Sequence, residues 1–173
     1  DGFQREVADD WQKAGDPWSF RKDDESVTVS FADYKVKAVP YDMPVIGYGG
    51  NTINTLRLWQ SEEADDFDFD LFNEMKTQVI ATRKVRAEEI CYVLYPNDST
   101  EKGRLLRLRQ EYFFTSATIQ DLVRKHKASG KPLEKLHESL SLQLNDTHPV
   151  FAIPELIRLL MEEKMSNEEV ELL

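Results

Sequence analysis

The chain is poor in the residues that form disulfides and metal sites, because its 173 residues include one cysteine and three histidines. Cys91 is the only cysteine, so an intrachain disulfide is impossible, and a reducing cytoplasm fits this composition. The thiol lies in an apolar run, where we expect a core residue and not a nucleophile. No apolar stretch approaches the ~20 residues that span a bilayer, and no signal peptide opens the chain. The sequence therefore predicts a cytoplasmic protein that does not cross a membrane.

Basic residues are also in deficit, with 22 lysines and arginines against 32 acidic residues and a formal charge of −10. Nucleic-acid binding usually requires a basic face, so this partner class is not expected. The acidic excess concentrates in residues 62–70 and 162–171, which we interpret as solvated surface. His126 and His137 lack the spacing of metal ligands, so no metal site is predicted. The length is sufficient for one domain with a sizeable core.

Several short segments carry strand patterns. Residues 27–31 alternate between apolar and polar side chains, and residues 34–39 follow as the expected hairpin partner. The glycine-rich residues 47–51 lack the spacing of a phosphate-binding loop and lead into a strand at 52–59. We therefore predict a turn there and no nucleotide phosphate site.

Three longer segments, 70–86, 104–127 and 149–161, carry apolar residues at helical spacing. Two short apolar runs, 90–94 and 141–144, are interpreted as buried strands. The strand at 141–144 and the helix after it complete a βαβ-like pattern, which is typical of an α/β protein.

The junction after 141–144 carries the strongest candidate site, in the order Asn145, Asp146, Thr147, His148. In an open α/β sheet, ligands bind at the carboxyl ends of strands. Carboxylate, hydroxyl and imidazole groups can bind the hydroxyls of a neutral sugar. The alternative is that Asn145, Asp146 or Thr147 merely caps the helix that begins at Pro149.

This junction and five further blocks resemble, in order, the α-glucan phosphorylases, which include the glycogen, starch and maltodextrin enzymes. The blocks are Glu6–Trp11 with Gly15–Trp18, Val39–Tyr48, Asn54–Trp59, Tyr95–Asp98, Leu106–Phe113 and Gln143–Leu156. The resemblance implies an α/β fold, part of a Rossmann-like (GT-B type) N-terminal domain with a small β-subdomain, long helices and short buried strands. It divides the chain into a trimmed β-subdomain and strand (1–60), a projecting helix with a gate loop (61–103) and an α/β core segment (104–173).

The resemblance also implies a function for the whole protein. Such enzymes are glucosyltransferases that release glucose 1-phosphate from an α-1,4-glucan with inorganic phosphate. Their cofactor, pyridoxal phosphate, is held by a lysine of a C-terminal domain, and no lysine here has that context. We expect a piece of a larger enzyme that is inactive alone and contains no catalytic residue. The alternative is a catalytically silent carbohydrate-binding or assembly module derived from the same fold.

The resemblance assigns substrate binding to two segments. Asp146, Thr147 and His148 would line the glucosyl site. Asn97 and Asp98 would belong to a gate loop over the cleft, with the aspartate near the substrate phosphate. On sequence alone, the alternative is an Asx-turn, which suits both the asparagine and the aspartate of that loop.

Two further assignments follow from the resemblance. The helix at 70–86 would project from the body and form a homodimer contact. Its apolar residues that recur at helical spacing are Leu71, Phe72, Met75, Val79 and Ile80. Arg124 and Lys125 match a pair of arginines that binds an effector phosphate in animal enzymes. The lysine cannot offer the same bidentate geometry, and simple dipole complementarity at the end of the helix is the alternative reading of this candidate anion site.

Overall fold

The computed structural model describes residues 18–64, 77–93, 96–145 and 148–171. The chain forms two compact units, Asp1–Gln110 and Glu111–Leu173. The long helix α4, Glu101–Ala128, begins in the first unit and ends in the second. Strands and helices are both present, so the predicted mixed α/β class is confirmed at this level.

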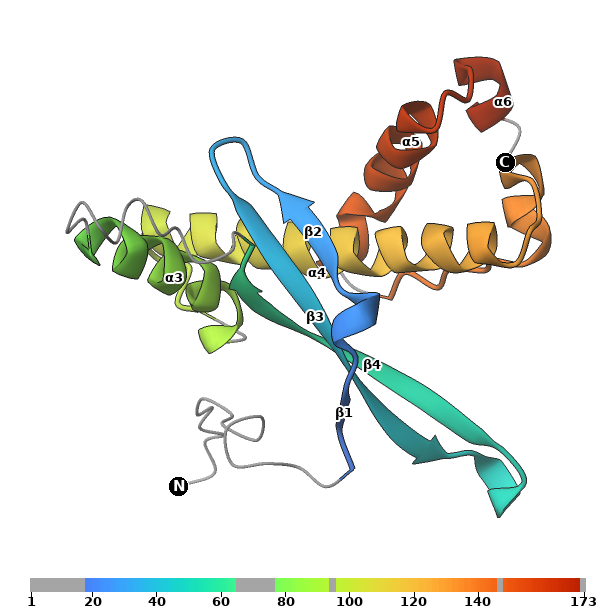
Figure 1. Ribbon diagram of the computed structural model, residues 1–173, viewed down its shortest axis with the longest axis horizontal. Coiled ribbons are helices and arrows are strands. Elements are labelled where there is room, and N and C mark those ends of the chain that lie inside the picture. Colours follow the sequence, from blue (N-terminus) through green and yellow to red (C-terminus); the bar gives the residue numbers. More distant parts are fainter. Residues whose placement is uncertain (1–17, 65–76, 94–95, 146–147, 172–173) are drawn as a thin grey trace. The chain divides into compact units, whose positions relative to one another are not determined.

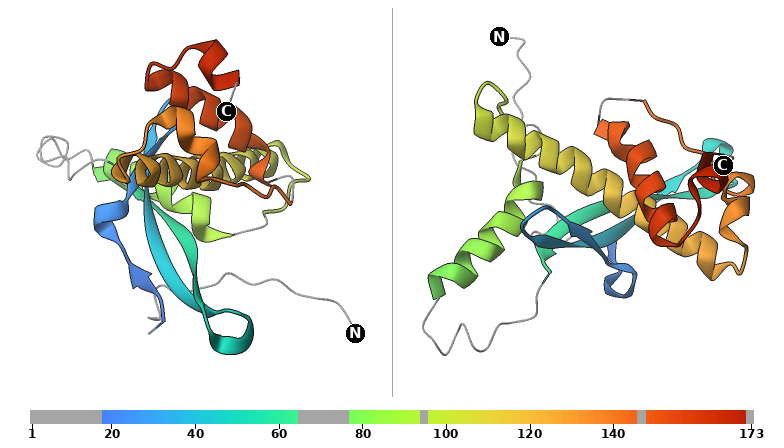
Figure 2. Two further views of the ribbon diagram at one scale, coloured as in Figure 1. Left: turned by 90° about the vertical axis from the view of Figure 1, so that its right-hand side faces the viewer. Right: turned by 90° about the horizontal axis from the view of Figure 1, so that it is seen from above.

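An antiparallel sheet is the centre of the first unit. Its described strands are β1 Phe20–Arg21, β2 Val27–Ser30, β3 Lys35–Ile46 and β4 Ile53–Glu63. β4 pairs with β3 along residues 36–46. On the other edge of β3, β2 pairs with residues 35–38 and β1 with residues 41–42. The short 3-10 helix η1, Asp23–Glu25, separates β1 from β2. Figure 1 and the left view of Figure 2 show β3 and β4 as one long twisted ribbon.

The hairpins follow the predicted pattern. β2 and β3 pair across the turn at Ala32 and Asp33, where the Phe31 amide donates to the Tyr34 carbonyl oxygen at 2.8 Å. The turn predicted at 47–51 contains the 3-10 helix η2, Tyr48–Gly50, and joins β3 to β4. Gly49 and Gly50 both have φ of +71°, a conformation that glycine adopts without the steric cost of a Cβ atom.

Helix α3, Thr77–Tyr92, packs against β4. The predicted helix at 70–86 is confirmed over 77–86, and residues 70–76 lie outside the described residues. The predicted strand at 90–94 is wrong, because residues 90–92 continue α3; Leu94 is not described. Ala87 and Ile90 are buried one turn apart, and the Gln110 side-chain amide donates to the carbonyl oxygens of Ile90 and Val93 at 2.7 and 2.5 Å. These bonds satisfy carbonyls at the helix end that lack intrahelical donors.

The second unit is helical in its described part. After α4 come η3 Leu133–Glu138, η4 His148–Phe151, α5 Ala152–Glu162 and α6 Asn167–Glu171. The helices predicted at 104–127 and 149–161 are therefore confirmed, with the first turn of the latter in 3-10 form. Their apolar faces meet in one cluster of Ile119, Val123 and Ala152, with Leu122, Leu133, Leu156 and Leu159 around it. Leu136, Leu160 and Met165 form a second cluster.

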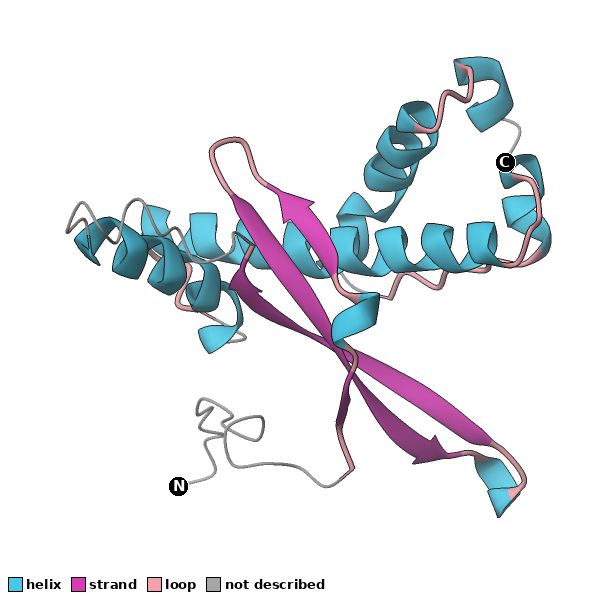
Figure 3. Ribbon diagram, viewed as in Figure 1, coloured by secondary structure: helices cyan, strands magenta, loops and turns pink. Residues whose placement is uncertain are grey.

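The predicted strand at 141–144 is wrong. These residues have no regular structure and are exposed, and Figure 3 draws only helix and loop in the described chain between α4 and α5. The alternation of Leu140, Leu142 and Leu144 suits a strand, but a strand also needs a partner for its backbone groups. The βαβ-like pattern is wrong for the same reason, since the described sheet is antiparallel and lies in the first unit.

Candidate functional site

The predicted glucosyl-binding segment is only partly described. Asp146 and Thr147 lie outside the described residues, and His148 is the first residue of η4. Asn145 is exposed, and no described strand ends just before it. This segment therefore does not lie at the carboxyl end of a described strand. α5 itself has Phe151 as its N-cap, without a side-chain cap bond. The residue before η4 is Thr147, which lies outside the described residues, so the capping alternative also stays a prediction. The glucosyl site stays a prediction that depends on the family resemblance.

The loop that carries Asn97 and Asp98 is tied to the first turns of α4. Asn97 Oδ1 accepts a hydrogen bond from the Ser99 amide at 2.9 Å, which is the geometry of an Asx-turn. Asp98 Oδ2 lies 2.9 Å from Arg107 Nη1, and Arg104 Nη1 donates to the Asp98 carbonyl oxygen at 3.3 Å. The loop conformation is thus set by its own polar groups, and the Asp98 carboxylate faces a cation of the same unit.

Gly103 allows this loop to lie close to α4. A Cβ atom on Gly103 would lie 1.8 Å from the Asn97 carbonyl oxygen and 2.8 Å from its carbonyl carbon. Any side chain here would displace the backbone of Asn97. Helix α4 begins at Glu101, three residues before the predicted start, and Thr100 Oγ1 accepts from the Gly103 amide at 3.1 Å. The glycine therefore fixes where the candidate gate loop meets the helix.

Arg124 and Lys125 share one buried acidic partner. Arg124 Nη2 lies 2.6 Å from Asp121 Oδ1, and Lys125 Nζ lies 2.8 Å from Asp121 Oδ2. Asp121 is buried, while both cations are partly exposed at their outer ends. A hollow of about 250 Å³ beside Arg124 is lined by Lys127 from α4 and by Glu162 and Glu163 at the C-terminal end of α5. The candidate anion site thus pairs two cations with an internal carboxylate, and the hollow beside it carries both signs of charge.

A buried polar network joins α4 to α5 through Glu155, which is 2% exposed. Its Oε1 accepts from Ser116 Oγ at 2.5 Å and from Arg158 Nη2 at 2.8 Å, and its Oε2 accepts from Arg158 Nε at 2.7 Å. Tyr112 Oη lies 3.5 Å from the same carboxylate. Burial alone would raise the pKa of Glu155, but the hydrogen bonds from Arg158 and Ser116 outweigh it and hold the pKa below its ordinary value. The group is therefore a structural anion in the second unit.

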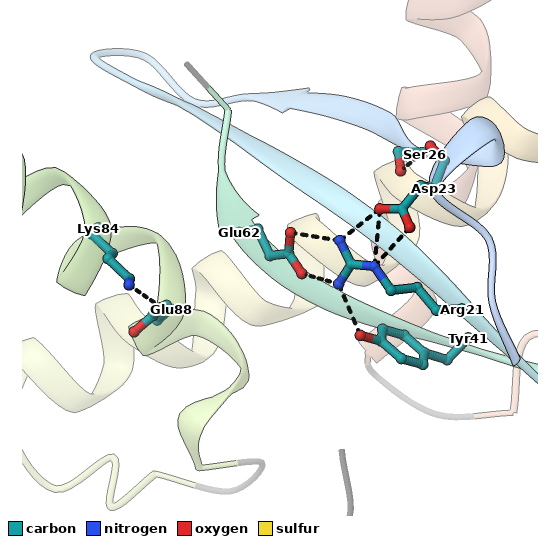
Figure 4. Close-up of polar contacts among 7 residues, drawn as sticks. All are labelled: Arg21, Asp23, Ser26, Tyr41, Glu62, Lys84 and Glu88. Carbon is teal, nitrogen blue, oxygen red and sulfur yellow. Dashed lines mark hydrogen bonds and ion pairs between the residues drawn. The ribbon is translucent and has the colours of Figure 1, made fainter. Parts of the chain in front are cut away.

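Two arginines fasten the η1 region to the ribbon. Arg21 on β1 donates to both carboxylate oxygens of Glu62, with Nη2 to Oε2 at 3.0 Å, and to Asp23 and the Tyr41 hydroxyl (Figure 4). Arg57 on β4 bonds Asp42 at 2.6 Å and Glu25 of η1 at 2.7 Å.

Each of these guanidinium groups is already bound by two carboxylates. Neither has the arrangement of an arginine that is held ready for a substrate phosphate, so the functions of Arg21 and Arg57 are structural in this unit.

A larger hollow, about 720 Å³, lies between the β2–β3 turn and α3. Arg86 forms part of its wall, stacked 3.8 Å from the centre of the Tyr34 ring and paired with Asp33 at 2.6 Å. Burial raises the pKa of Tyr34. Lys35, Arg83, Glu63 and Gln78 add both signs of charge and an amide to the lining, so the hollow has no single electrostatic character.

Metal and thiol chemistry receive no support from the described residues. They contain no group of three histidine, cysteine or acidic side chains that could bind a metal ion. Burial raises the pKa of the Cys91 thiol, whose sulfur lies 3.5 Å from the Trp59 carbonyl oxygen. A raised pKa disfavours the thiolate, and the Cys91 side chain is partly buried, so the predicted core position is met only in part. Among the described helices, none combines the length and apolarity of a membrane span.

Sequence reasoning missed the structural roles of Asp121 and Glu155, which pair with cations inside the second unit. The three- and four-residue spacings from Asp121 to Arg124 and Lys125, and from Glu155 to Arg158, are the spacings of ion pairs on a helix. They could have indicated both pairs. Nothing local indicates that the carboxylates are buried, because burial depends on which helix packs against them.

Comparison with known proteins agrees with the resemblance found in the sequence. A sequence profile of the carbohydrate phosphorylase family matches residues 1–170. Glycogen phosphorylase of Synechocystis sp. is 39% identical over 182 residues, covering 94% of this chain and 21% of that protein. The human liver form is 40% identical over 185 residues (94% and 22%), and the Saccharomyces cerevisiae enzyme is 37% identical over 190 residues (98% and 21%).

The chain is therefore an α/β member of the carbohydrate phosphorylase family. It spans about a fifth of the length of the curated relatives it matches. The family assignment made from the ordered sequence blocks is confirmed.

Proposed function

We propose that this chain is part of an α-1,4-glucan phosphorylase, a hexosyltransferase that releases glucose 1-phosphate from glycogen or a related glucan with inorganic phosphate. The observation that carries the proposal is the match over residues 1–170, together with about 40% identity to glycogen phosphorylases of a cyanobacterium, a yeast and an animal. No feature of the chain favours the alternative of a catalytically silent module.

In this proposal the chain contributes to the N-terminal, Rossmann-like half of a GT-B fold. The antiparallel sheet of the first unit would be the small β-subdomain, and α4 and α5 would belong to the α/β core. This proposal rests on the family assignment and on the order of the matching blocks. The proposed division is a trimmed β-subdomain and strand at 1–60, a projecting helix with the gate loop at 61–103, and a segment of the α/β core at 104–173.

Substrate binding would involve two segments of the chain. Asp146, Thr147 and His148 would contact the glucosyl unit, for which short polar side chains are suited. Asn97 and Asp98 would form the gate loop, whose close contact with α4 at Gly103 supports a defined position for it. Closed, the Asp98 carboxylate would repel phosphate, and its ion pair with Arg107 offers a way to neutralise that charge.

The cofactor expected for this family is pyridoxal phosphate, and the described residues do not fit its attachment site. A lysine that forms a Schiff base is normally desolvated so that its amine can lose a proton. No lysine in the described residues is buried, and Lys84, Lys125, Lys127 and Lys135 form ion pairs. The attachment lysine would belong to another part of the enzyme.

The expected partners are the glucan, inorganic phosphate and a second subunit. The helix at 70–86 would supply the dimer contact; in its described part, Val79 is exposed on α3. Arg124 and Lys125 would form an effector site for an anion only if the ligand competes with Asp121 for both cations. The single cysteine and the acidic composition suit a cytoplasmic enzyme that binds neither nucleic acid nor membrane.

The direct test is a phosphorolysis assay on the full-length polypeptide that contains this chain. We expect glucose 1-phosphate to form from an α-1,4-glucan only when inorganic phosphate is present, and activity to be lost when pyridoxal phosphate is removed. Glucan binding without phosphorolysis would establish the silent module instead. The 173-residue chain alone should show neither activity nor a stoichiometric, borohydride-trappable cofactor adduct.

A further inference from the structure

The far end of the β3–β4 ribbon is unusual because the described residues supply only two strands there. β2 pairs with β3 up to Ala38, and β1 pairs up to Asp42. Beyond the Asp42–Arg57 pair, β3 and β4 continue together to Ile46 and Ile53. Figure 1 shows this end extending away from β2 and α3. A two-stranded ribbon is marginally stable in water unless another layer packs on it.

Residues 43–56, the ribbon tip, contain no charged side chain and no histidine. The whole chain is 31% charged, so about four charged residues would be expected in a segment of this length at average composition. Exposed strand edges are normally protected by charges, and lysine is especially common. Here the charges stop at the Asp42–Arg57 ion pair. The segment is therefore uncharged throughout, although most of its side chains are exposed.

Both faces of the ribbon tip carry large apolar side chains, together with Asn54 on one face and Thr55 on the other. Directly opposed residues share a face, so Ile46 and Ile53 lie on one face, where they are 76% and 73% exposed. Met43 opposes Leu56 on the other face, where Leu56 is 47% exposed, with Val45 further along at 45%. Soluble proteins rarely expose large contiguous apolar patches without a partner. A partner for this ribbon must cover two opposite sides.

We propose that the ribbon tip inserts between two uncharged, apolar surfaces of the rest of the phosphorylase polypeptide. This inference rests on the proposed function, because the occupant is the part of the enzyme that the relatives contain beyond the matched fifth of their length. A second copy of the chain is a poorer fit. A two-fold contact buries one patch against its own copy and would leave the other face of the ribbon in water.

The test compares the same substitutions in the 173-residue chain and in the full-length protein. Ile53→Lys charges one face, and Leu56→Lys charges the other. In the short chain neither substitution should change the thermal midpoint, because both side chains are exposed and surface changes are usually small. In the full-length protein each substitution should lower the thermal midpoint and the yield of soluble enzyme. Ala32→Lys, in the exposed β2–β3 turn, is the control and should have no effect in either protein.

Hydroxyl-radical footprinting provides a second measurement that does not depend on folding of a variant. Met43 and the fully exposed Tyr48 should be labelled in the short chain and protected in the full-length protein. Equal labelling in both proteins, or a full-length protein that tolerates both lysines, would overturn the inference. So would a dimer of the short chain that dissociates when one face alone is charged, since the occupant would then be a second copy.

Wild-type phosphorolysis separates this inference from the proposed function. A full-length protein that is inactive but protects the ribbon tip would refute the proposed activity and retain the insertion. An active enzyme with an unprotected tip would refute the insertion and retain the activity.

Discussion

Replacing Glu155 by glutamine should lower the unfolding free energy of the second unit, by an amount that can be estimated from the hydrogen bonds of the carboxylate. The carboxylate accepts three hydrogen bonds of 2.5–2.8 Å from Ser116 and Arg158. A glutamine of the same size has one acceptor oxygen, so at least one donor would face an NH2 group. Losing one hydrogen bond to a charged group costs about 1.5–3 kcal/mol. The larger cost of an isolated buried charge is not expected, because the Arg158 side chain is 43% exposed and also reaches Glu162 at 2.5 Å.

Urea unfolding followed by two probes can locate this loss. All three tryptophans, Trp11, Trp18 and Trp59, belong to the first unit, so their fluorescence reports on that unit. Far-ultraviolet circular dichroism includes the helices of the second unit. With the usual dependence on urea, the circular dichroism midpoint should fall by about 1 M, while the fluorescence midpoint changes less.

Glu162→Gln is the matched control, because it removes the other carboxylate bound to Arg158 from an exposed position, where an ion pair contributes about 0–1 kcal/mol. If Glu155→Gln changes the circular dichroism midpoint no more than this control does, the network does not stabilise the unit and the reasoning is refuted.

The pH dependence provides an independent check on Glu155. Its pKa is lower in the folded chain than its ordinary value of 4.5. Its contribution to stability is therefore present above the unfolded pKa and is lost as pH falls through the folded pKa. The difference in unfolding free energy between wild type and Glu155→Gln should be largest near neutral pH and should shrink below about pH 4.5. A difference that stays constant from neutral pH into the acid range would contradict the assignment.

Three further changes test other parts of the structure. Arg57→Met removes the cation between two carboxylates and should lower the unfolding free energy of the first unit by about 1.5–3 kcal/mol, read from Trp59 fluorescence, since the guanidinium lies 5.9 Å from that ring; an unchanged midpoint would rule this out. His126→Phe removes two 2.8 Å hydrogen bonds, to Ser139 Oγ and the Pro132 carbonyl oxygen, in the segment that follows α4. Amide exchange in that segment should become faster. Equal exchange would mean that its apolar contacts hold it in place. Gly103→Ala should displace the Asn97 backbone and alter the phosphate dependence of the full-length enzyme, and unaltered phosphate dependence would argue against a gate at this loop.

The helices and strands that the sequence predicts correctly are those whose hydrophobic pattern and packing partner both lie within a short stretch of the chain. Residues 27–31 alternate and meet a partner four residues beyond their end, so the hairpin needs no distant information. Helix α4 presents an apolar stripe over many turns and ends before Gly130, which has φ of +75°. The family of the chain could also be predicted from the sequence, because six ordered blocks are more specific than any single motif.

The errors lie where local pattern and tertiary context disagree. Ile90 and Cys91 form part of a short apolar run that suits a strand or a buried helix equally well, and packing of α3 on β4 favoured the helix. Leu140, Leu142 and Leu144 alternate, but no described strand pairs with them. The candidate site inherits this second error, because the prediction placed Asp146 and His148 at the end of that strand. Their assignment now depends on the resemblance alone.

The Arg21–Glu62 contact has a consequence for the accuracy of folding. The two residues lie on different strands, β1 and β4, which flank β3 on opposite edges (Figure 4). The ion pair can therefore form only if both strand pairings are correct at once. A slip of one residue in either pairing would turn one side chain to the other face of the sheet and leave the guanidinium without that partner. The Arg21–Glu62 ion pair therefore stabilises only the sheet in which β1 and β4 are both in the correct register with β3.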